Sequence, residues 1–463
     1  MPFCTTTVPL CLSETFELSE LSMSHLEAAP RPSLDLHGGR FAKLRRSVLA
    51  FAGGDWACFT GPRSEPFAAR LDRDMFSARP RTRHASPSRA RRGRSLVGER
   101  PLSAGCGLVE VDDAIRLMSV TLPERDDVLD EAYERLFRYG PEFDGWLSNH
   151  GPMVVEVLER NHRPDAISAW LDRYTRRLEP APSPRWTIER DGWREVLGDS
   201  IRLGDWLTLF ETELQERPWR DVLVEWWPRL LPGAIAAATH ALIRTGHALR
   251  ALENKETESR VRELGMALGY WAARFQPLPA ARQLSGQLAP WEALARLPRI
   301  EASHGGARTR LSQLADMAPW PDALAALCPP ADPEQVPAEL DALVEATVAQ
   351  YLEYGRAEPV MLVHAATAPA AAAAALPLLP VDLWRLTWET AWSASAAMTA
   401  CYAVLGTDAG ERISSLTPDE VFSRAVENGD EHVIKFTDVA ILAHNRGCVA
   451  ALSAASHAVS LVV

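Results

Sequence analysis

The sequence predicts an all-α fold, in which one large multi-helical domain with a buried histidine-rich centre follows a disordered N-terminal extension. After about residue 120, apolar residues recur every three or four positions, and tracts of alternating β-branched residues are scarce. Nine of the twelve histidines follow residue 117, several of them within apolar segments. Because a buried imidazole needs a partner for each polar nitrogen, histidine has no packing advantage in a core. These histidines are therefore candidates for chemistry.

Residues 1–117 differ in composition from the rest, which places a domain boundary between 1–117 and 118–463. They carry a net charge of +4, against −16 for the remainder, and include the run RPRTRHASPSRARRGR after Arg79. Such a run cannot bury enough apolar surface to offset its ordering entropy. One interpretation is a basic arm for nucleic acid or an acidic partner. We favour a disordered or spurious extension with Met118 as the natural start. The acidic remainder is itself not expected to form a nucleic-acid surface.

Cysteine spacing and hydropathy indicate in which cellular compartment the protein works. The seven cysteines form no C-x-x-C pair, which argues against a disulfide framework or a cysteine zinc site. The first residues lack a signal-peptide pattern. The longest uncharged stretch, 359–381, contains four prolines and His364, which makes it a poor membrane span. We therefore predict a cytoplasmic protein with no membrane partner.

Helical periodicity places the elements in order. The segment 122–140 has apolar residues at helical spacing, acidic residues early and Gly140 as its stop. Pro152 suits the first turn of the following helix. Residues 277–333 are rich in Pro and Gly and are expected to be loops. Further helices are expected at 153–161, 166–178, 205–215, 218–233, 234–252, 257–275 and 337–355, around His364, along Trp384, Trp388 and Trp392, and at 430–445.

The segment ATHALIRTGHALRAL is the most informative one. His240 and His247 are seven residues apart, about two helical turns, and Arg244 lies between them on the same face. The surrounding residues are small or apolar, so this face is expected to be interior. One hypothesis is a metal site, because neutral imidazole is a common ligand. From spacing alone, two core histidines with hydrogen-bond partners are the favoured interpretation.

Three further segments supply candidates. In Asn149-His150-Gly151-Pro152 the histidine sits in a turn that enters a helix, and Asn149 is a candidate cap. His364 lies in the most apolar stretch, where an imidazole without a partner is costly. His432 and Lys435 share one helical face, for which a solvated salt-bridge face is the simpler interpretation. A buried neutral Lys435, or its carbamate formed with carbon dioxide, is the alternative that would bind a metal.

Three common nucleotide-binding and hydrolase motifs are absent from the sequence. There is no G-x-G-x-x-G after a predicted strand, no Walker A pattern and no G-x-S-x-G elbow. A Rossmann-type flavin or nicotinamide domain is therefore not expected.

Taken together, the segments resemble the questin oxidase-like family in order and spacing over about residues 122–445. They are YGPEFDGWLSNHGPM, PWRDVLVEWWPRLLPG, ATHALIRTGHALRAL, LGYWAARF, LVHAATAP and DEHVIKFTD. The resemblance implies an oxygenase that uses molecular oxygen, and possibly NADPH, for ring cleavage or oxygenation of an aromatic polyketide or anthraquinone-type substrate. It also implies a histidine-rich non-haem iron centre, for which the candidate ligands are His150, His240, His247, His364, His432 and Lys435.

Six candidates exceed what one iron ion commonly needs, so some are expected to orient a ligand or move a proton. Arg244 and Asn149 are the candidate catalytic residues, and Arg244 would stabilise a phenolate or peroxide anion. Trp146, Tyr270 and Trp271 are expected either to form an aromatic wall or to pack in the core. The alternative function is a non-catalytic helical protein that binds a hydrophobic aromatic ligand. A weaker third hypothesis is a DNA-associated protein that uses the basic run.

Overall fold

The computed structural model describes residues 127–278, 283–301, 305–404 and 415–462, and the predicted N-terminal extension lies outside these ranges. The described part is almost entirely helical, which confirms the all-α prediction. Its two strands, β1 (Glu142–Phe143) and β2 (Leu147–Ser148), pair antiparallel as a short hairpin just before His150.

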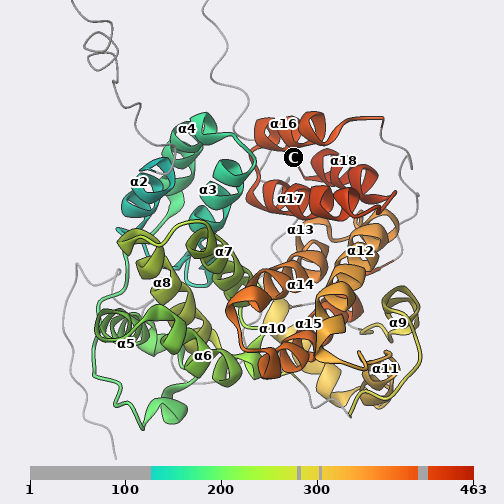
Figure 1. Cartoon of the computed structure of the whole chain (residues 1–463), viewed down its shortest axis with the longest axis horizontal. Coiled ribbons are helices and arrows are strands. Elements are labelled where there is room, and N and C mark those ends of the chain that lie inside the picture. The colour runs from blue at the N-terminus through green and yellow to red at the C-terminus, as the bar shows by residue number, and fades with distance from the viewer. Residues whose placement is uncertain (1–126, 279–282, 302–304, 405–414, 463) are drawn as a thin grey trace, which may run out of the picture. The chain divides into compact units, whose positions relative to one another are not determined.

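The helices of the first half follow the sequence closely (Figure 1). The predicted segment 166–178 ends in a 3₁₀ turn, and 3₁₀ turns also precede α5 and follow α6. The α-helices are α2 (Asp127–Leu136), α3 (Gly151–Arg160), α4 (Pro164–Tyr174), α5 (Leu203–Glu216), α6 (Trp219–Leu230), α7 (His240–Asn254) and α8 (Glu258–Arg274). The 3₁₀ helices are η2 (Thr175–Arg177), η3 (Trp193–Val196), η4 (Ser200–Arg202) and η5 (Leu231–Gly233).

The second half begins with the Pro-rich region, which holds short helices between its loops: α9 (Pro290–Arg296), α10 (Ala307–Ser312), η6 (Gln313–Asp316), α11 (Trp320–Ala325) and η7 (Pro333–Gln335). Longer helices follow: α12 (Val336–Tyr354), α13 (Pro359–Leu362), α14 (His364–Ala375), α15 (Trp384–Tyr402), α16 (Pro418–Asn428), α17 (Glu431–Asn445) and α18 (Ala451–Leu461). The 3₁₀ helices η8 (Leu376–Leu378) and η9 (Val381–Leu383) link α14 to α15. The sequence pattern did not predict α16.

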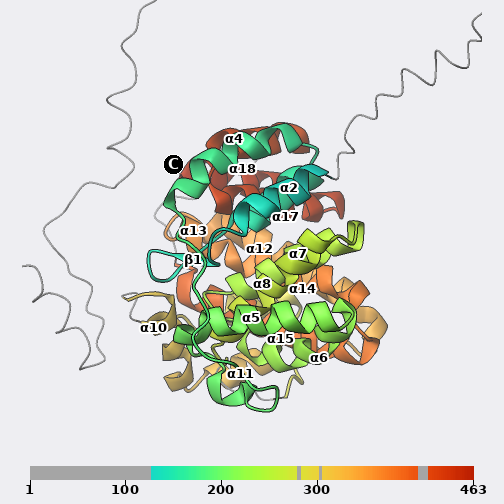
Figure 2. The ribbon, with the colours of Figure 1, turned by 90° about the vertical axis from the view of Figure 1, so that its left-hand side faces the viewer.

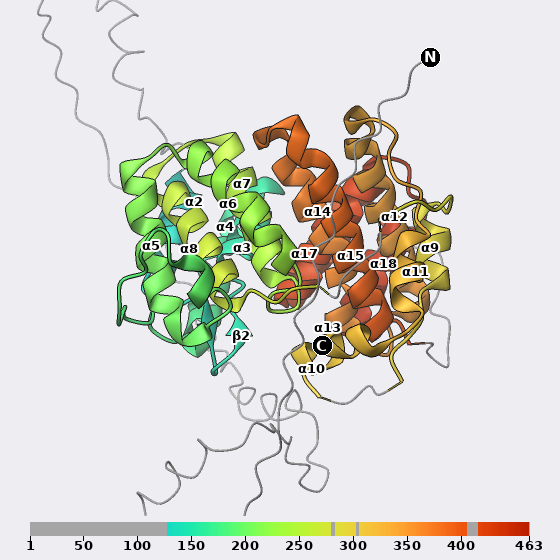
Figure 3. The same cartoon turned by 90° about the horizontal axis from the view of Figure 1, so that it is seen from below.

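Helices α7 and α14 lie side by side at the centre (Figures 1 and 3). On one side α7 packs against α8, which in turn packs against α5. On the other side α14 packs against α12 and α15. Helix α3 contacts α7 and α17, and α17 also contacts α14. Figure 2 shows α2 and α4 on the outer side of this group. The centre is therefore where α3, α7, α14 and α17 converge.

The stretch Pro359–Leu378 is the described segment that is long and apolar enough to cross a membrane. Two thirds of its most apolar window (67%) is buried within the protein, as in a core helix. Its alanines give α14 a narrow surface, so neighbouring helices approach closely.

Helix α7 begins at His240, later than the predicted start at residue 234. Ala237, Ala238 and Thr239 have φ values of 49°, 54° and 72°, a left-handed turn that ends the preceding segment. Each non-glycine residue in this conformation costs about 1–2 kcal/mol. Such strain persists where the surrounding structure over-determines it, and it is frequent at functional sites.

Gly246 allows the close approach of α7 and α14. A Cβ atom at this position would lie 2.5 Å from Cβ and 2.7 Å from Cα of Ala371 on α14. Because backbone atoms of a packed helix cannot yield cheaply, only glycine fits here.

We expect Gly246→Ala to lower the free energy of unfolding by about 1–3 kcal/mol through overpacking. This exceeds the gain of about 1 kcal/mol in helix propensity. Chemical denaturation measures the change, and Gly192→Ala is the control because its added Cβ meets nothing closer than 3.6 Å. Equal stabilities of the two variants would contradict the close-approach role.

Candidate metal centre

Four histidines from different elements meet at the centre of the fold. His150 precedes α3 as its N-cap, and His240, His364 and His432 lie in the first turns of α7, α14 and α17. Ring centroids lie 4.6 Å apart for His150 and His240, 4.5 Å for His150 and His432, and 4.3 Å for His240 and His364. One ligand atom from each of His150, His240 and His432 falls within a group spanning 4.8 Å. We call His150, His240, His364 and His432 the histidine cluster.

The contact between His240 and His364 is unfavourable for two neutral imidazoles with no ion between them. Nδ1 of His240 lies 2.6 Å from the carbonyl oxygen of Ala237, and Nδ1 of His364 lies 3.0 Å from that of Met361. A carbonyl oxygen only accepts hydrogen bonds, so each Nδ1 carries the proton of its ring. Both Nε2 atoms are then bare, yet they lie only 2.9 Å apart.

Two facing lone pairs need a proton or a cation beside them. Burial, together with the neighbouring positive groups, lowers the pKa of both rings well below the usual value, so an extra proton is disfavoured. Two nitrogens bound at right angles to one ion at 2.0–2.1 Å would be about 2.9 Å apart. The geometry of this pair therefore fits a shared metal ion.

The other two histidines have carboxylates on their Nδ1 side. Glu431 Oε1 lies 3.5 Å from Nδ1 of His150, and Asp430 Oδ1 lies 3.4 Å from Nδ1 of His432. Both Nδ1 atoms are buried, and within the described residues neither has a partner of hydrogen-bond geometry. The cluster thus has an oxygen atom near every Nδ1, the arrangement that fixes the tautomer of a metal-binding histidine.

Lys435 lies one turn after His432 and is 2% exposed, so the predicted solvated face is instead buried. Burial lowers its pKa to about 8, while Glu431 and Asp430 act in the opposite direction. Its Nζ donates to Met153 Sδ at 4.0 Å, a long and weak contact. Among the described residues no carboxylate lies within ion-pair distance of Nζ. Its charge disfavours protonation of His150, His240 and His364, which places it beside the cluster.

The structure does not bring His247 into the cluster. Its Nδ1 lies 2.7 Å from Glu156 Oε2, and burial and Arg250 lower its pKa. Arg244 forms a bidentate pair with Glu263 on α8, at 2.6 and 2.8 Å, and leaves its buried Nη1 without a partner in the described structure. The sequence placed both residues on one face with His240, but neighbouring helices engage them separately.

Asn149 and the three predicted wall residues have structural partners or surface positions. Asn149 accepts the Gly151 amide through Oδ1 and donates to the Gly140 carbonyl through Nδ2, each at 2.9 Å. It therefore fixes the turn that carries His150, and the N-cap position predicted for Asn149 belongs to His150. Trp271 is fully buried, the hydroxyl of Tyr270 lies 2.6 Å from that of Ser148, and Trp146 is 62% exposed at the hairpin.

A buried ionic network lies beside the cluster on helices α3, α7 and α17. Glu156 of α3 binds both His247 and Arg250 of α7. Arg250 also pairs with Asp438 of α17 at 3.2 Å, and Asp438 accepts from Arg160 and Asn161. Burial alone would raise the pKa of Glu156, but Arg250 and His247 hold it well below its usual range. We call these residues the ionic network.

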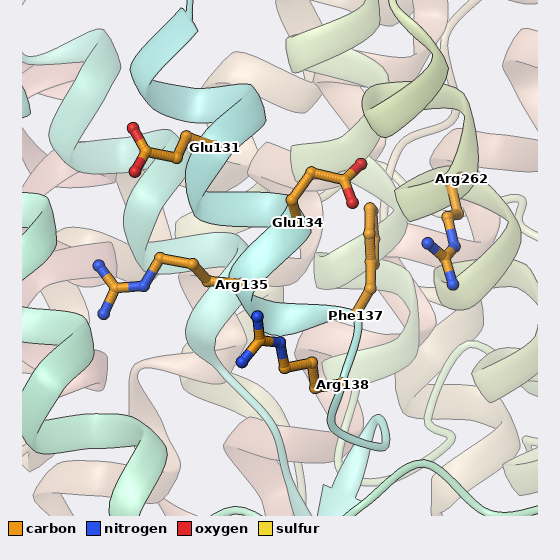
Figure 4. A pocket seen from close by; sticks show the side chains of 6 residues that line it. All are labelled: Glu131, Glu134, Arg135, Phe137, Arg138 and Arg262. Atoms are coloured by element: carbon orange, nitrogen blue, oxygen red, sulfur yellow. The ribbon is translucent and has the colours of Figure 1, made fainter.

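Two surface pockets lie away from the histidine cluster. One, of about 390 Å³, is lined by residues of α2 and α8 and their neighbours: Glu131, Glu134, Arg135, Phe137, Arg138 and Arg262 (Figure 4). In it the Arg262 guanidinium lies 4.3 Å from the centre of the Phe137 ring. The second, of about 420 Å³, is lined by Glu156, Arg160 and Arg250 of the ionic network, among others. Neither pocket is lined by a cluster histidine.

The chain is thus an all-helical protein with a buried histidine cluster that could hold a metal ion. Residues 157–257 match the model of a family described as Questin oxidase-like. The match confirms the resemblance to this family for a segment that spans α4 to α7, shorter than the predicted 122–445. No curated protein matches the chain. The family's name points to an oxidase and so to an oxidoreductase.

We expect Asp438→Asn to lower the free energy of unfolding by about 1–3 kcal/mol, because the buried carboxylate that accepts from both Arg160 and Arg250 is lost, although Arg250 keeps Glu156 as a partner. The matched control is Asp172→Asn, because Asp172 pairs with Arg135 at the surface and its side chain is 64% exposed. An exposed pair contributes about 0–1 kcal/mol. Denaturation curves that shift equally for the two variants would show that the ionic network is not coupled to stability.

We expect Lys435→Met to stabilise the metal-free protein at pH 7 by up to about 3 kcal/mol, the equivalent of the pKa difference between 10.5 and about 8. The unfolded chain binds this proton more tightly than the folded one. Stability of the parent protein therefore rises with pH between about 8 and 10.5, and the variant lacks this rise. Melting curves in buffer free of carbon dioxide check both points. Equal pH slopes for the two proteins would show that Lys435 is not a buried, titrating amine.

Proposed function

We propose that the protein is an oxygen-dependent oxidoreductase whose histidine cluster binds one non-haem iron ion. The observation that carries the proposal is the pair of bare Nε2 atoms of His240 and His364, 2.9 Å apart, with both Nδ1 protons held by carbonyls. His150 and His432 complete a set of four imidazoles. Imidazole ligands suit iron as well as zinc and copper, and the family's name favours a redox metal.

The residues of the chain favour the neutral form of His150, His240 and His364 and separate the site from bulk water. The residues His240 and His432 are 8% and 9% exposed, so little of their surface meets solvent. Burial and Lys435 lower the pKa of His150, which favours the neutral form that binds a metal. When bound, the iron would supply binding and activation of molecular oxygen at an open coordination position.

Lys435 is a candidate additional ligand in this proposal. Its buried amine has a pKa of about 8, so a fraction is neutral near physiological pH. A neutral amine reacts with carbon dioxide to give a carbamate and a released proton. The resulting anion would offer a carboxylate-like oxygen in a place where the described structure gives Nζ no acidic partner. The intact mass of the native, metal-bound protein tests for the added carbon dioxide.

Arg244 and Asn149 have different parts in the proposal. The unpartnered Nη1 of Arg244, one helical turn from His240, is a donor for an anionic oxygen of the substrate. Asn149 acts through the turn that it holds before His150. We propose an aromatic or quinone-type small molecule as substrate, since the family is described by an oxidase of that kind. NADPH as an electron donor and a cytoplasmic location stay predictions, and so does the assignment of 118–463 as one catalytic domain.

We expect the purified full-length chain to contain about one iron per molecule, as measured by elemental analysis. His240→Ala and His364→Ala each remove one of the paired Nε2 atoms and should lose most of the metal. His444→Gln is the control, because His444 is a half-buried histidine near the end of α17. It should retain the metal of the parent protein.

The proposal fails if the folded protein takes up no stoichiometric metal when it is offered ferrous iron without oxygen. Tight binding of a quinone by that metal-free protein would instead support the helical binding protein. Zinc in place of iron would retain the site but remove the oxygenase reaction.

A further inference from the structure

The turn before α3 is held from outside the histidine cluster by residues that no sequence motif singled out. His150 donates its backbone N–H to the hydroxyl of Tyr174, the last residue of α4, at 2.6 Å. This bond fixes where the backbone of His150 lies but leaves the ring free to rotate about its side-chain torsions. A second contact is needed to set the direction of the imidazole.

Glu431 is placed to make that second contact. Its Oε1 lies 3.5 Å from Nδ1 of His150, and within the described structure this buried nitrogen has no other acceptor. A buried N–H without an acceptor costs about 1–3 kcal/mol. The ring therefore gains by turning its Nδ1 proton toward the carboxylate, which leaves the lone pair on Nε2.

Arg177 holds Glu431 in this position. Its Nη2 donates to the same Oε1 at 2.7 Å, and its guanidinium lies 4.2 Å from the centre of the Tyr174 ring. The side chain of Glu431 is 12% exposed although it is the first residue of α17. The three-residue η2 turn after α4 thus carries an arginine that reaches across to α17.

We propose that Glu431 is the positioning residue of His150. It accepts the Nδ1 proton and so keeps Nε2 available for the metal, and Arg177 holds the carboxylate in place. The inference rests on the metal centre proposed above for its consequence, but the tautomer of His150 can be observed without any metal. Asp430 stands in the same relation to His432, yet it also caps α17 through two backbone amides, so its variants would confound the two effects.

The test uses the full-length chain labelled with ¹⁵N-histidine and freed of metal. Long-range ¹H–¹⁵N spectra distinguish the two neutral tautomers, and His150→Gln identifies the signals of His150. We expect the Nδ1–H tautomer in the parent protein and in Glu431→Gln, whose amide oxygen still accepts. In Glu431→Ala the preference should be lost. Glu427→Ala, at an exposed position of α16, is the control and should match the parent.

The second readout is affinity for Co²⁺, measured by competition with a chelator. Loss of a carboxylate that orients a histidine ligand typically costs 10–100-fold in affinity. We expect a loss of this size for Glu431→Ala, a smaller one for Arg177→Met, and parent-like binding for Glu431→Gln. If Glu431→Ala does not fold, Arg177→Met and Glu431→Gln still separate positioning from simple packing.

The outcomes separate the two proposals. A parent protein that binds no Co²⁺ but shows the Glu431-dependent tautomer would contradict the metal centre and retain the positioning role. Parent-like tautomer and affinity in Glu431→Ala would overturn the role of Glu431 while the metal centre stands. An Nε2–H tautomer for His150 in the parent protein would also overturn it.

Discussion

The ionic network is the interaction on which the rest of the centre depends. Glu156, Arg250 and Asp438 each come from a different helix, α3, α7 and α17, and these helices also carry three of the four cluster histidines. Charges removed from water are tolerated only when they are paired, so these helices pack in one relative position. The same position brings His150, His240 and His432 together. Convergence of the imidazoles is thus a consequence of how charge is neutralised about two to three turns further along the same helices.

The interior around the cluster is arranged to disfavour added positive charge. Lys435 brings a positive group among four imidazoles, and burial already lowers the pKa of three of them. Neutral rings are the form that binds a metal ion. A bound cation would at the same time meet the repulsion of Lys435, unless the amine is neutral or carbamylated. The low pKa of the histidines and the low pKa of Lys435 therefore belong together. A cation can bind to the neutral imidazoles only when Lys435 has also lost its positive charge.

The sequence predicted most of the helices, because they depend on local pattern. All four cluster histidines were also candidates, but as metal ligands they rested on the family resemblance and not on spacing. Periodicity located α3, α5, α8 and α12, and histidines in apolar segments marked His240 and His364 as exceptional. Periodicity did not show that His247 lies outside the cluster that contains His240. Spacing along one helix cannot show which neighbour each side chain contacts. For the same reason, Glu156 and Glu431 were not among the candidates. Their burial is set by helices distant in the sequence, and only the assembled packing reveals it.

The left-handed turn at Ala237–Thr239 also has a chemical consequence. A right-handed continuation of α7 through these residues would engage the Ala237 carbonyl in the main-chain ladder, four residues ahead. In the observed turn that oxygen lies 2.6 Å from the imidazole of His240. The left-handed conformation of Ala237–Thr239 thus sets which ring nitrogen of His240 carries the proton. The tautomer of the His240 imidazole is therefore set by the main-chain conformation. It would survive any side-chain exchange at 237 or 238 that kept the turn.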